Sequence, residues 1–412
     1  MTNLGTLDIT TPQAFADPAT LLSNYKRLRA EAPVCFMEPA GYRPYWAVTK
    51  HADIMEVEKQ NDRFINDPRL TVMPIETEQM ILEMTGGNNH IIRSLVDMDN
   101  PDHHKYRILT QAWFMPGNVK KRAEAIDGLA KHFIDRMADL GGECDFMQDV
   151  AAWFPLRVVM QILGVPEEDE PMMLKLTQEL FGGEDPELGR SESTIDANVI
   201  MDFYNYFAAI TADRRANPKD DVATVIANAE IDGQPIPDLE AMSYYVIVAT
   251  AGHDTTSSST AGGLLALIEN PDQMAKLKAD MDLLPSAVDE MIRWVTPVKH
   301  FCRTATEDYE LRGQSIKKDD TLVMCYWSGN RDEDVFDAPD RFDVTRSPNP
   351  QIAFGHGAHK CLGMHLARME MAALYRELLS RLDHVELAGE PTYVAANFVS
   401  GLKSLPIRYT MK

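Results

Sequence analysis

The stretch Phe354-Gly-His-Gly-Ala-His-Lys-Cys361-Leu-Gly363 decides how the rest of the chain is interpreted. It places one cysteine in a glycine-punctuated loop, and an amphipathic pattern follows it directly and runs to about Arg381. We therefore expect Cys361 at a helix N-terminus, where backbone N–H groups and the helix dipole lower the pKa of a thiol. The glycines would let a flat ligand approach the backbone closely. The alternative is a strand-to-helix loop with a buried, inert cysteine.

Composition restricts the class of protein. The 412 residues show no internal break or low-complexity linker, so we expect one large unit over residues 1–412, mainly α with a minor β region. The net charge of −23 argues against binding to nucleic acid or to an anionic membrane. The 5 cysteines are too widely spaced to indicate a zinc site or disulfides, which favours a reducing cytoplasm. The sequence contains no run of about 20 apolar residues, so we do not expect a membrane span.

The longest predicted helix runs from Asp238 to Glu269. Its apolar pattern is interrupted by the polar segment Ala251-Gly-His-Asp-Thr-Thr256, which predicts a local kink. One interpretation is a strained helix whose hydroxyl groups bond to preceding carbonyls. The other is a proton relay, because an acid (Asp254) stands beside an alcohol (Thr255).

Other segments allow two interpretations each. His103 and Arg107 lie four residues apart, hence on one helical face, and form either a carboxylate-binding pair or a solvated basic face. The pair Glu290 and Arg293 would ordinarily be an exposed salt bridge. Residues 68–95 have weak periodicity but many apolar side chains, which favours a binding loop over disorder. The loop from Gly182 to Ser193 has the composition of a lid.

The cysteine stretch resembles the haem-binding signature of the cytochrome P450 monooxygenases, Phe-x-x-Gly-x-x-x-Cys-x-Gly. The polar segment of the long helix is similar to the Ala/Gly-Gly-x-Asp/Glu-Thr signature of the same family. The segment from Asp99 to Arg107 matches Asp-x-Pro-x-His-x-x-x-Arg, and Glu290 with Arg293 matches the structural Glu-x-x-Arg pair. These matches follow the family order over most of the chain.

The resemblance implies a single haem-thiolate fold shaped as a triangular prism around a long central helix, with haem b as cofactor. It implies that Cys361 ligates the iron, which favours O–O cleavage, and that Asp254 and Thr255 supply protons. The positions that match propionate contacts are His103, Arg107, Arg303 and His359; for Arg303 the alternative is a surface charge on a strand. The positions expected to contact substrate are Ile247, Ala251, Val298, Phe398 and Val399.

A closer likeness concerns residues 142–147, 165–178, 249–258 and 297–299, which are similar to bacterial members that hydroxylate α-terpineol. We therefore expect a soluble monomer that inserts one atom of O₂ into a C–H bond of a small hydrophobic molecule, a monoterpenoid or an alkyl-aromatic. Because no flavin or nicotinamide domain is apparent, the resemblance implies electrons from a [2Fe–2S] ferredoxin with its reductase. A basic face for this partner is predicted from Lys105, Arg107, Lys120, Lys121, Arg122 and Lys360; the alternative is scattered, solvated charges.

Three other functions remain open at this stage. A haem-thiolate sensor or carrier would bind a ligand without turnover, although the retained Asp254 and Thr255 speak against it. A peroxide-driven oxygenase would not need that acid–alcohol pair. A helical interaction protein without haem is the third alternative.

Overall fold

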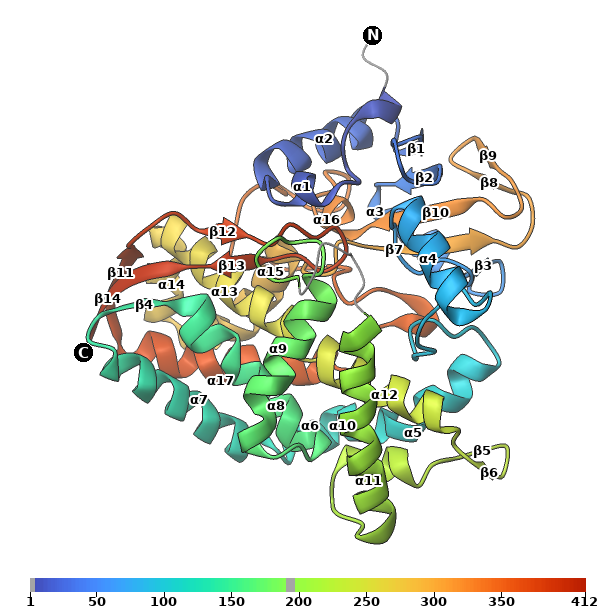
Figure 1. The fold of residues 1–412 in the computed structure, drawn as a ribbon. Helices are drawn as coiled ribbons and strands as arrows, with labels where there is room; N and C mark the ends of the chain where they lie inside the picture. Colours follow the sequence, from blue (N-terminus) through green and yellow to red (C-terminus); the bar gives the residue numbers. More distant parts are fainter. Residues whose placement is uncertain (1–3, 190–196) are drawn as a thin grey trace.

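The computed structural model describes residues 4–189 and 197–412. Helices dominate, and the strands form small sheets at the periphery, as the composition predicts (Figure 1). The helices are α1 Pro12–Phe15, α2 Pro18–Glu31, α3 His51–Glu58, α4 Ile75–Thr85, α5 Asp102–Phe114, α6 Pro116–Lys120, α7 Ala123–Asp139, α8 Trp153–Leu163, α9 Glu170–Phe181, α10 Ala197–Ala216, α11 Val222–Ala227, α12 Asp238–Ala251, α13 Asp254–Glu269, α14 Pro271–Ala279, α15 Leu284–Val295, α16 Tyr326–Gly329 and α17 Met364–Arg381. The strands are β1 Val34–Met37, β2 Tyr45–Val48, β3 Phe64–Ile65, β4 Glu143–Asp145, β5 Glu230–Ile231, β6 Gln234–Pro235, β7 His300–Ala305, β8 Tyr309–Leu311, β9 Gln314–Ile316, β10 Thr321–Cys325, β11 Leu382–Leu387, β12 Thr392–Tyr393, β13 Leu402–Ser404 and β14 Pro406–Met411.

The predicted central helix is two helices, α12 and α13, separated at Gly252 and His253. The amide of His253 bonds to the carbonyl of Thr250 instead of continuing the α-helical ladder. The hydroxyl of Thr255 donates to the Ala251 carbonyl at 2.9 Å, and that of Ser257 donates to the His253 carbonyl at 2.8 Å. Side-chain hydroxyls thus donate hydrogen bonds to backbone carbonyls at the break. The predicted kink is present, and it is strong enough to divide the helix in two.

The cysteine loop packs against α3, where Gly357 lies close to the backbone of Glu58. Helix α17 begins at Met364, directly after the loop, as predicted, and α13 packs against both α15 and α17. The five-stranded sheet has the order β1-β2-β10-β7-β3, and β7 pairs antiparallel with β10. An isolated bridge joins Val298, just before β7, to Val399 in the turn between β12 and β13. The two segments predicted to contact substrate are therefore held together.

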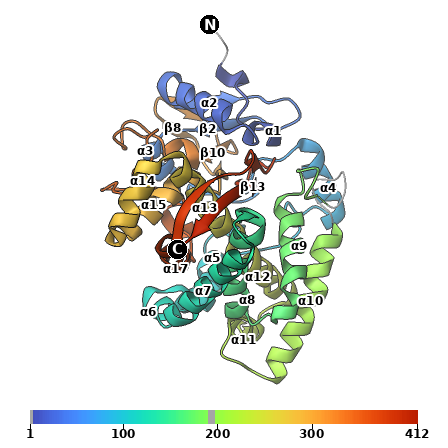
Figure 2. The same ribbon diagram turned by 90° about the vertical axis from the view of Figure 1, so that its left-hand side faces the viewer.

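Two element boundaries differ from what the sequence pattern indicates. Residues 68–95 contain α4, which ends at a left-handed Gly86 with φ of 67°. The pattern over residues 119–140 is typical of one helix, but the structure divides it between α6 and α7, and α6 begins with Pro116 at a favoured first position. The predicted lid loop is described only to Gly189, and the rest lies outside the described residues. Helices α9 and α10, on either side of it, lie next to each other (Figure 2).

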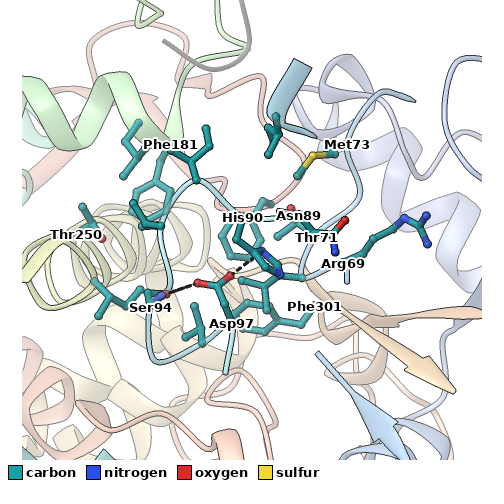
Figure 3. A pocket seen from close by; sticks show the side chains of 18 of the residues that line it. Arg69, Thr71, Met73, Asn89, His90, Ser94, Asp97, Phe181, Thr250 and Phe301 are labelled. Atoms are coloured by element: carbon teal, nitrogen blue, oxygen red, sulfur yellow. Dashed lines mark hydrogen bonds and ion pairs between the residues drawn. The ribbon is translucent and has the colours of Figure 1, made fainter. Parts of the chain in front are cut away.

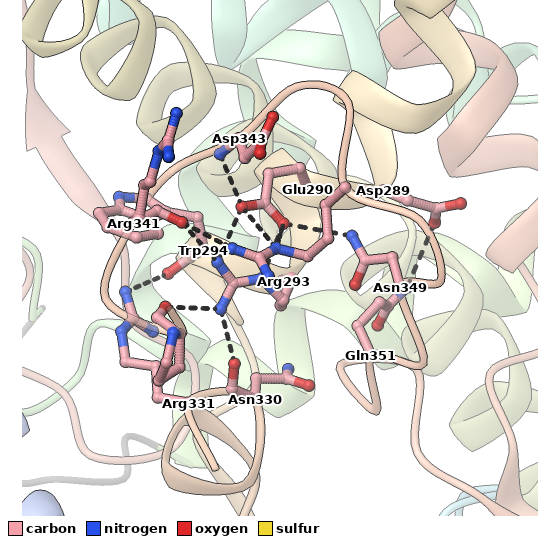
Figure 4. A network of polar contacts seen from close by, with 12 residues as sticks. Asp289, Glu290, Arg293, Trp294, Asn330, Arg331, Arg341, Asp343, Asn349 and Gln351 are labelled. Atoms are coloured by element: carbon pink, nitrogen blue, oxygen red, sulfur yellow. Dashed lines mark hydrogen bonds and ion pairs between the residues drawn. The ribbon is translucent and has the colours of Figure 1, made fainter. Parts of the chain in front are cut away.

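Glu290 and Arg293 form a buried structural pair, not an exposed salt bridge (Figure 4). Arg293 Nε donates to Glu290 Oε2 at 2.7 Å, and Arg293 Nη1 donates to the Asn330 carbonyl at 2.7 Å and the Pro339 carbonyl at 3.0 Å. Glu290 also accepts from Arg346 Nε at 3.0 Å. The pair therefore fastens α15 to the segment that leads into the cysteine loop.

No helix in the described part of the chain combines the length and the apolar character needed to cross a membrane.

Candidate active site

The cysteine loop is held by backbone contacts that only glycine permits. The Cys361 amide donates to the Phe354 carbonyl at 2.8 Å, which closes the loop. Gly357 has a φ of 69°, and a Cβ atom there would lie 2.0 Å from the carbonyl oxygen of Glu58. A side chain at position 357 would therefore displace α3 or the loop.

The low pKa predicted for the Cys361 thiol is wrong for the protein without a bound metal ion. Burial raises the pKa of this thiol, and it outweighs the opposing effect of the Gly363 and Met364 amides, which bond to the sulfur. Cys361 has exposed surface because it opens onto a cavity, yet the protein surrounds it densely. A metal ion bound to the sulfur would reverse the direction, since a coordinating thiol is deprotonated.

Two histidines and two arginines line the same cavity. The rings of His103 and His359 lie 4.0 Å apart between their centroids, and the cavity is also lined by Arg107 and Arg303. Burial and the neighbouring guanidinium groups lower the pKa of His103 to about 4 and that of His359 to about 2, so both rings are neutral near pH 7. Glu58 Oε1 lies 3.3 Å from Arg303 Nη2.

Arg107 has no carboxylate partner within the described residues. Its Nη2 donates to the Lys360 carbonyl at 2.6 Å, and burial lowers its pKa. The Nε2 atom of His103 is buried without a hydrogen-bond partner. An uncompensated cation and an unpaired ring nitrogen in one cavity indicate that the cavity accepts an anionic group.

Two adjoining cavities share a wall. The first, of about 340 Å³, is lined by all five side chains predicted to contact substrate. The second, of about 230 Å³, is lined by Cys361 and the four predicted propionate contacts. The residues common to both are Val96, Ile247, Ala251, Thr255, Val298 and Phe301. The structure therefore brings together two sets of residues that are scattered along the sequence.

Comparison with known proteins gives the family. The model of the family described as "Cytochrome P450" matches residues 189–411. The protein described as "Cytochrome P450-terp" from a Pseudomonas species is 47% identical over 97% of this chain and 96% of its own length. The crystal structure of CYP108D1 from Novosphingobium aromaticivorans superposes with a TM-score of 0.93 at 47% identity, covering 100% of this chain and 99% of that one. The chain belongs to the cytochrome P450 family.

Other P450 relatives extend the comparison. A steroid C26-monooxygenase of Mycolicibacterium smegmatis is 33% identical over 90% of this chain and 84% of its own length. The structure of CYP268A2 of Mycobacterium marinum in complex with pseudoionone has a TM-score of 0.89 at 35% identity, and each chain covers 98% of the other. The predicted fold class is thereby confirmed, and the protein is a haem-thiolate monooxygenase.

The residues present fit the haem of this P450. A cysteine ligand and several basic side chains in one cavity are what an iron porphyrin with two carboxylate arms requires. A Cβ atom added at Gly363, two residues after Cys361, would meet no heavy atom within 4 Å, so open space lies beside the loop. The assignments of Cys361, His103, Arg107, Arg303 and His359 remain predictions that this geometry favours.

The two predicted proton donors of the P450 occupy different environments. Thr255 lines both cavities, whereas Asp254 lines neither and instead borders a third cavity of about 50 Å³. Burial raises the pKa of Asp254 to about 8, and its Oδ2 atom has no hydrogen-bond partner. The neighbouring His253, to which no role is assigned from sequence, lies with Nε2 at 3.3 Å from Asp254 Oδ1.

Polar residues around the two cavities were not found from the sequence. His90 and Asp97 line the first cavity, and Nδ1 of His90 lies 3.3 Å from Oδ1 of Asp97 (Figure 3). At the second cavity, Glu58 and Asn66 contact Arg303 and His359. Residues 68–95 were predicted only as a binding loop, and a lone polar residue in such a segment gives no signal of what it faces.

Proposed function

We propose that this P450 inserts one oxygen atom from O₂ into a C–H bond of a small hydrophobic substrate, a monoterpenoid such as α-terpineol or an alkyl-aromatic. The observation that carries the proposal is the wall of Ile247, Ala251, Thr255, Val298 and Phe301, which the apolar first cavity shares with the cavity of Cys361. A substrate in the first cavity would therefore present a C–H bond towards the second. We further propose one folding unit over residues 1–412, acting as a cytoplasmic monomer.

The haem, when bound, supplies the iron at which O₂ is activated, with Cys361 as the proposed ligand. His103, Arg107, Arg303 and His359 would hold its carboxylate arms. Thr255 would position a proton donor at the shared wall, and Asp254 would replenish that donor from the third cavity. The apolar side chains orient the substrate and exclude water from it.

The proposed substrate class is supported by the lining and by relatives. Ile247, Phe398 and Val399 present hydrocarbon to the cavity, whose volume of about 340 Å³ suits a small ligand. One relative carries the name "Cytochrome P450-terp", and the structure of another is a complex with pseudoionone. Hydroxylated product from α-terpineol or an alkylbenzene, formed with a reducing system and O₂, is the expected result. Turnover with peroxide alone would favour the peroxide-driven alternative, and binding without product would favour a sensor.

Replacing Thr255 with alanine is expected to uncouple electron consumption from product formation. The Thr255 hydroxyl donates to the Ala251 carbonyl and borders both cavities, so its loss removes the group that positions a proton donor. The product formed per electron pair should fall by roughly tenfold, at the low end of effects seen for proton-transfer groups. The measurement compares electron-donor oxidation with product yield.

Ser257→Ala is the matched control for that variant. The Ser257 hydroxyl makes the same kind of bond, to the His253 carbonyl, but Ser257 is buried and lines none of the three cavities described. Its coupling should equal that of the unaltered protein. Equal coupling in Thr255→Ala would remove the proposed role of Thr255.

We propose a [2Fe–2S] ferredoxin, with its reductase, as the electron donor, docking beside the cysteine loop. Helices α5 and α6 pack against α17 there, and Lys120, Lys121 and Lys360 are exposed. Two members of the basic face predicted from sequence are not free: Lys105 lies 2.5 Å from Asp232, and Arg107 lines the second cavity. Arg122 is half-buried, with its guanidinium 4.7 Å from the Trp113 ring centroid.

Electron transfer from an acidic ferredoxin should slow as salt is added. The Debye length falls from about 30 Å at 0.01 M to about 8 Å at 0.15 M ionic strength, which screens attraction between exposed charges. Lys121→Glu should lower the second-order rate at low salt, and Lys318→Glu, at an exposed position between β9 and β10, should not. A salt-independent rate would contradict this docking face.

A further inference from the structure

A polar pair, His90 and Asp97, stands in the wall of the first cavity (Figure 3). Most of the exposed lining is apolar, and its other polar side chains include Arg43, Arg69, Glu78 and Asn89. His90 Nδ1 lies 3.3 Å from Asp97 Oδ1, and the Asp97 side chain is 9% exposed. The other carboxylate oxygen, Oδ2, accepts from the Ser94 amide at 3.0 Å and from the Ser94 hydroxyl at 2.5 Å. Asp97 is therefore fixed on both oxygens, and it fixes the ring of His90 in turn.

This arrangement determines which ring nitrogen is free. With Nδ1 facing Asp97, Nε2 is the ring nitrogen left for another partner. Within the described residues, Nε2 is buried and has no hydrogen-bond partner. Asp67 Oδ1 lies 3.6 Å away, which is beyond hydrogen-bond distance. A hydroxyl group, which can both donate and accept a hydrogen bond, suits this nitrogen.

The surrounding cavity indicates what carries that donor. Ile91, Ile92, Phe181 and Phe398 line the same space, so a ligand there is mainly hydrocarbon. Val96, next to Asp97, also lines the cavity of Cys361. A ligand held at His90 therefore extends along a wall that leads to the proposed site of oxidation.

We propose that His90 Nε2 forms a hydrogen bond with a hydroxyl group of the substrate, and that Asp97 and Ser94 are positioning residues for the His90 ring. The substrate is thus a small alcohol with a hydrocarbon body, anchored by its hydroxyl and oxidised elsewhere. This inference rests on the proposed function and narrows its substrate class. A hydrocarbon of the same skeleton fills the cavity but leaves Nε2 unpaired.

The test compares two ligands that differ by one hydroxyl, α-terpineol and p-menth-1-ene. Their dissociation constants are measured on the haem-loaded protein from the spin-state change and, independently, by calorimetry. The unaltered protein should prefer the alcohol, and His90→Phe should reduce that preference by roughly three- to tenfold, the effect of one net hydrogen bond. His90→Gln, which keeps an amide able to accept, should retain part of the preference. Asp97→Asn should reduce it less than His90→Phe.

Phe398→Leu is the control, because it removes apolar contact and should weaken both ligands by the same factor. A His90→Phe protein that keeps the alcohol preference would overturn the inference, and so would an unaltered protein that binds neither ligand or prefers the hydrocarbon. If His90→Phe fails to retain haem, the test uses the ratio of the two dissociation constants in His90→Gln and Asp97→Asn instead. Hydroxylation of p-menth-1-ene, assayed separately, tests the oxygenase function whatever the ligand preference.

Discussion

Asp254→Asn is expected to lower kcat by about 100-fold, because a positioned proton-transfer group contributes typically 10²–10⁴-fold. Asparagine keeps the shape of the side chain but cannot release a proton. Asp254 lines neither of the two larger cavities, so substrate affinity should stay unchanged while kcat falls. The measurement is steady-state turnover together with a substrate titration.

The pH profile gives an independent check on the same residue. Burial raises the pKa of Asp254 to about 8, so the carboxyl group carries its proton at neutral pH and loses it as pH rises through that value. The kcat of the unaltered protein should therefore decrease above about pH 8, and Asp254→Asn should lack this decrease. Burial lowers the pKa of His253 to about 3, so that ring stays neutral over this range.

Ser258→Ala is a matched control, because Ser258 borders the same cavity of about 50 Å³ but carries no proton that titrates in this range. It should keep both the kcat and the pH profile. An Asp254→Asn protein with normal kcat would place proton delivery elsewhere.

Arg293→Ala is expected to lower the free energy of unfolding by about 3–5 kcal/mol, the usual effect of removing one partner of a buried ion pair. Arg293 and Glu290 are fully buried, and the variant leaves the Glu290 carboxylate with Arg346 as its remaining charged partner (Figure 4). Carbonyls of Asn330 and Pro339 also lose their donor. Urea unfolding and haem retention measure the effect.

Arg27→Ala is the control for the loss of an arginine from an ion pair. Arg27 and Glu31 form an i,i+4 pair at 3.3 Å with side chains 38% and 53% exposed. Its removal should change stability by less than about 0.5 kcal/mol. If Arg293→Ala and Arg27→Ala lowered the free energy of unfolding by similar amounts, the buried network would stabilise the fold no more than an exposed ion pair does.

The sequence predicts the proposed iron ligand and the proposed propionate contacts better than the polar residues around them. Cys361, His103, Arg107, Arg303 and His359 could be predicted because the segments around them resemble signatures of the P450 family, whereas spacing alone left alternatives open. His90, Asp97, Glu58 and Asn66 act through neighbours brought close only by the fold, and no local pattern marks them. Helix α4 was missed because its apolar residues follow no clear period.

Local rules also failed where tertiary structure opposes them. The helix-terminus argument predicted a lowered pKa for Cys361, but burial of the thiol raises it in the protein alone. The pair Glu290 and Arg293 has the spacing of a surface salt bridge, and its burial depends on the segment 330–349 that covers it. Only a kink was predicted where α12 and α13 are separated, because the sequence shows the hydroxyl groups but not the carbonyls to which they bond.

The absorption spectrum of the dithionite-reduced, carbon-monoxide-bound protein tests the central claim most directly. Thiolate ligation by Cys361 predicts a strongly red-shifted Soret band in the unaltered protein and its loss in Cys361→His. Cys302→Ser, which changes a buried cysteine outside the two cavities, should keep the band. A haem spectrum without the red shift in the unaltered protein, or a red shift that survives Cys361→His, would contradict the account.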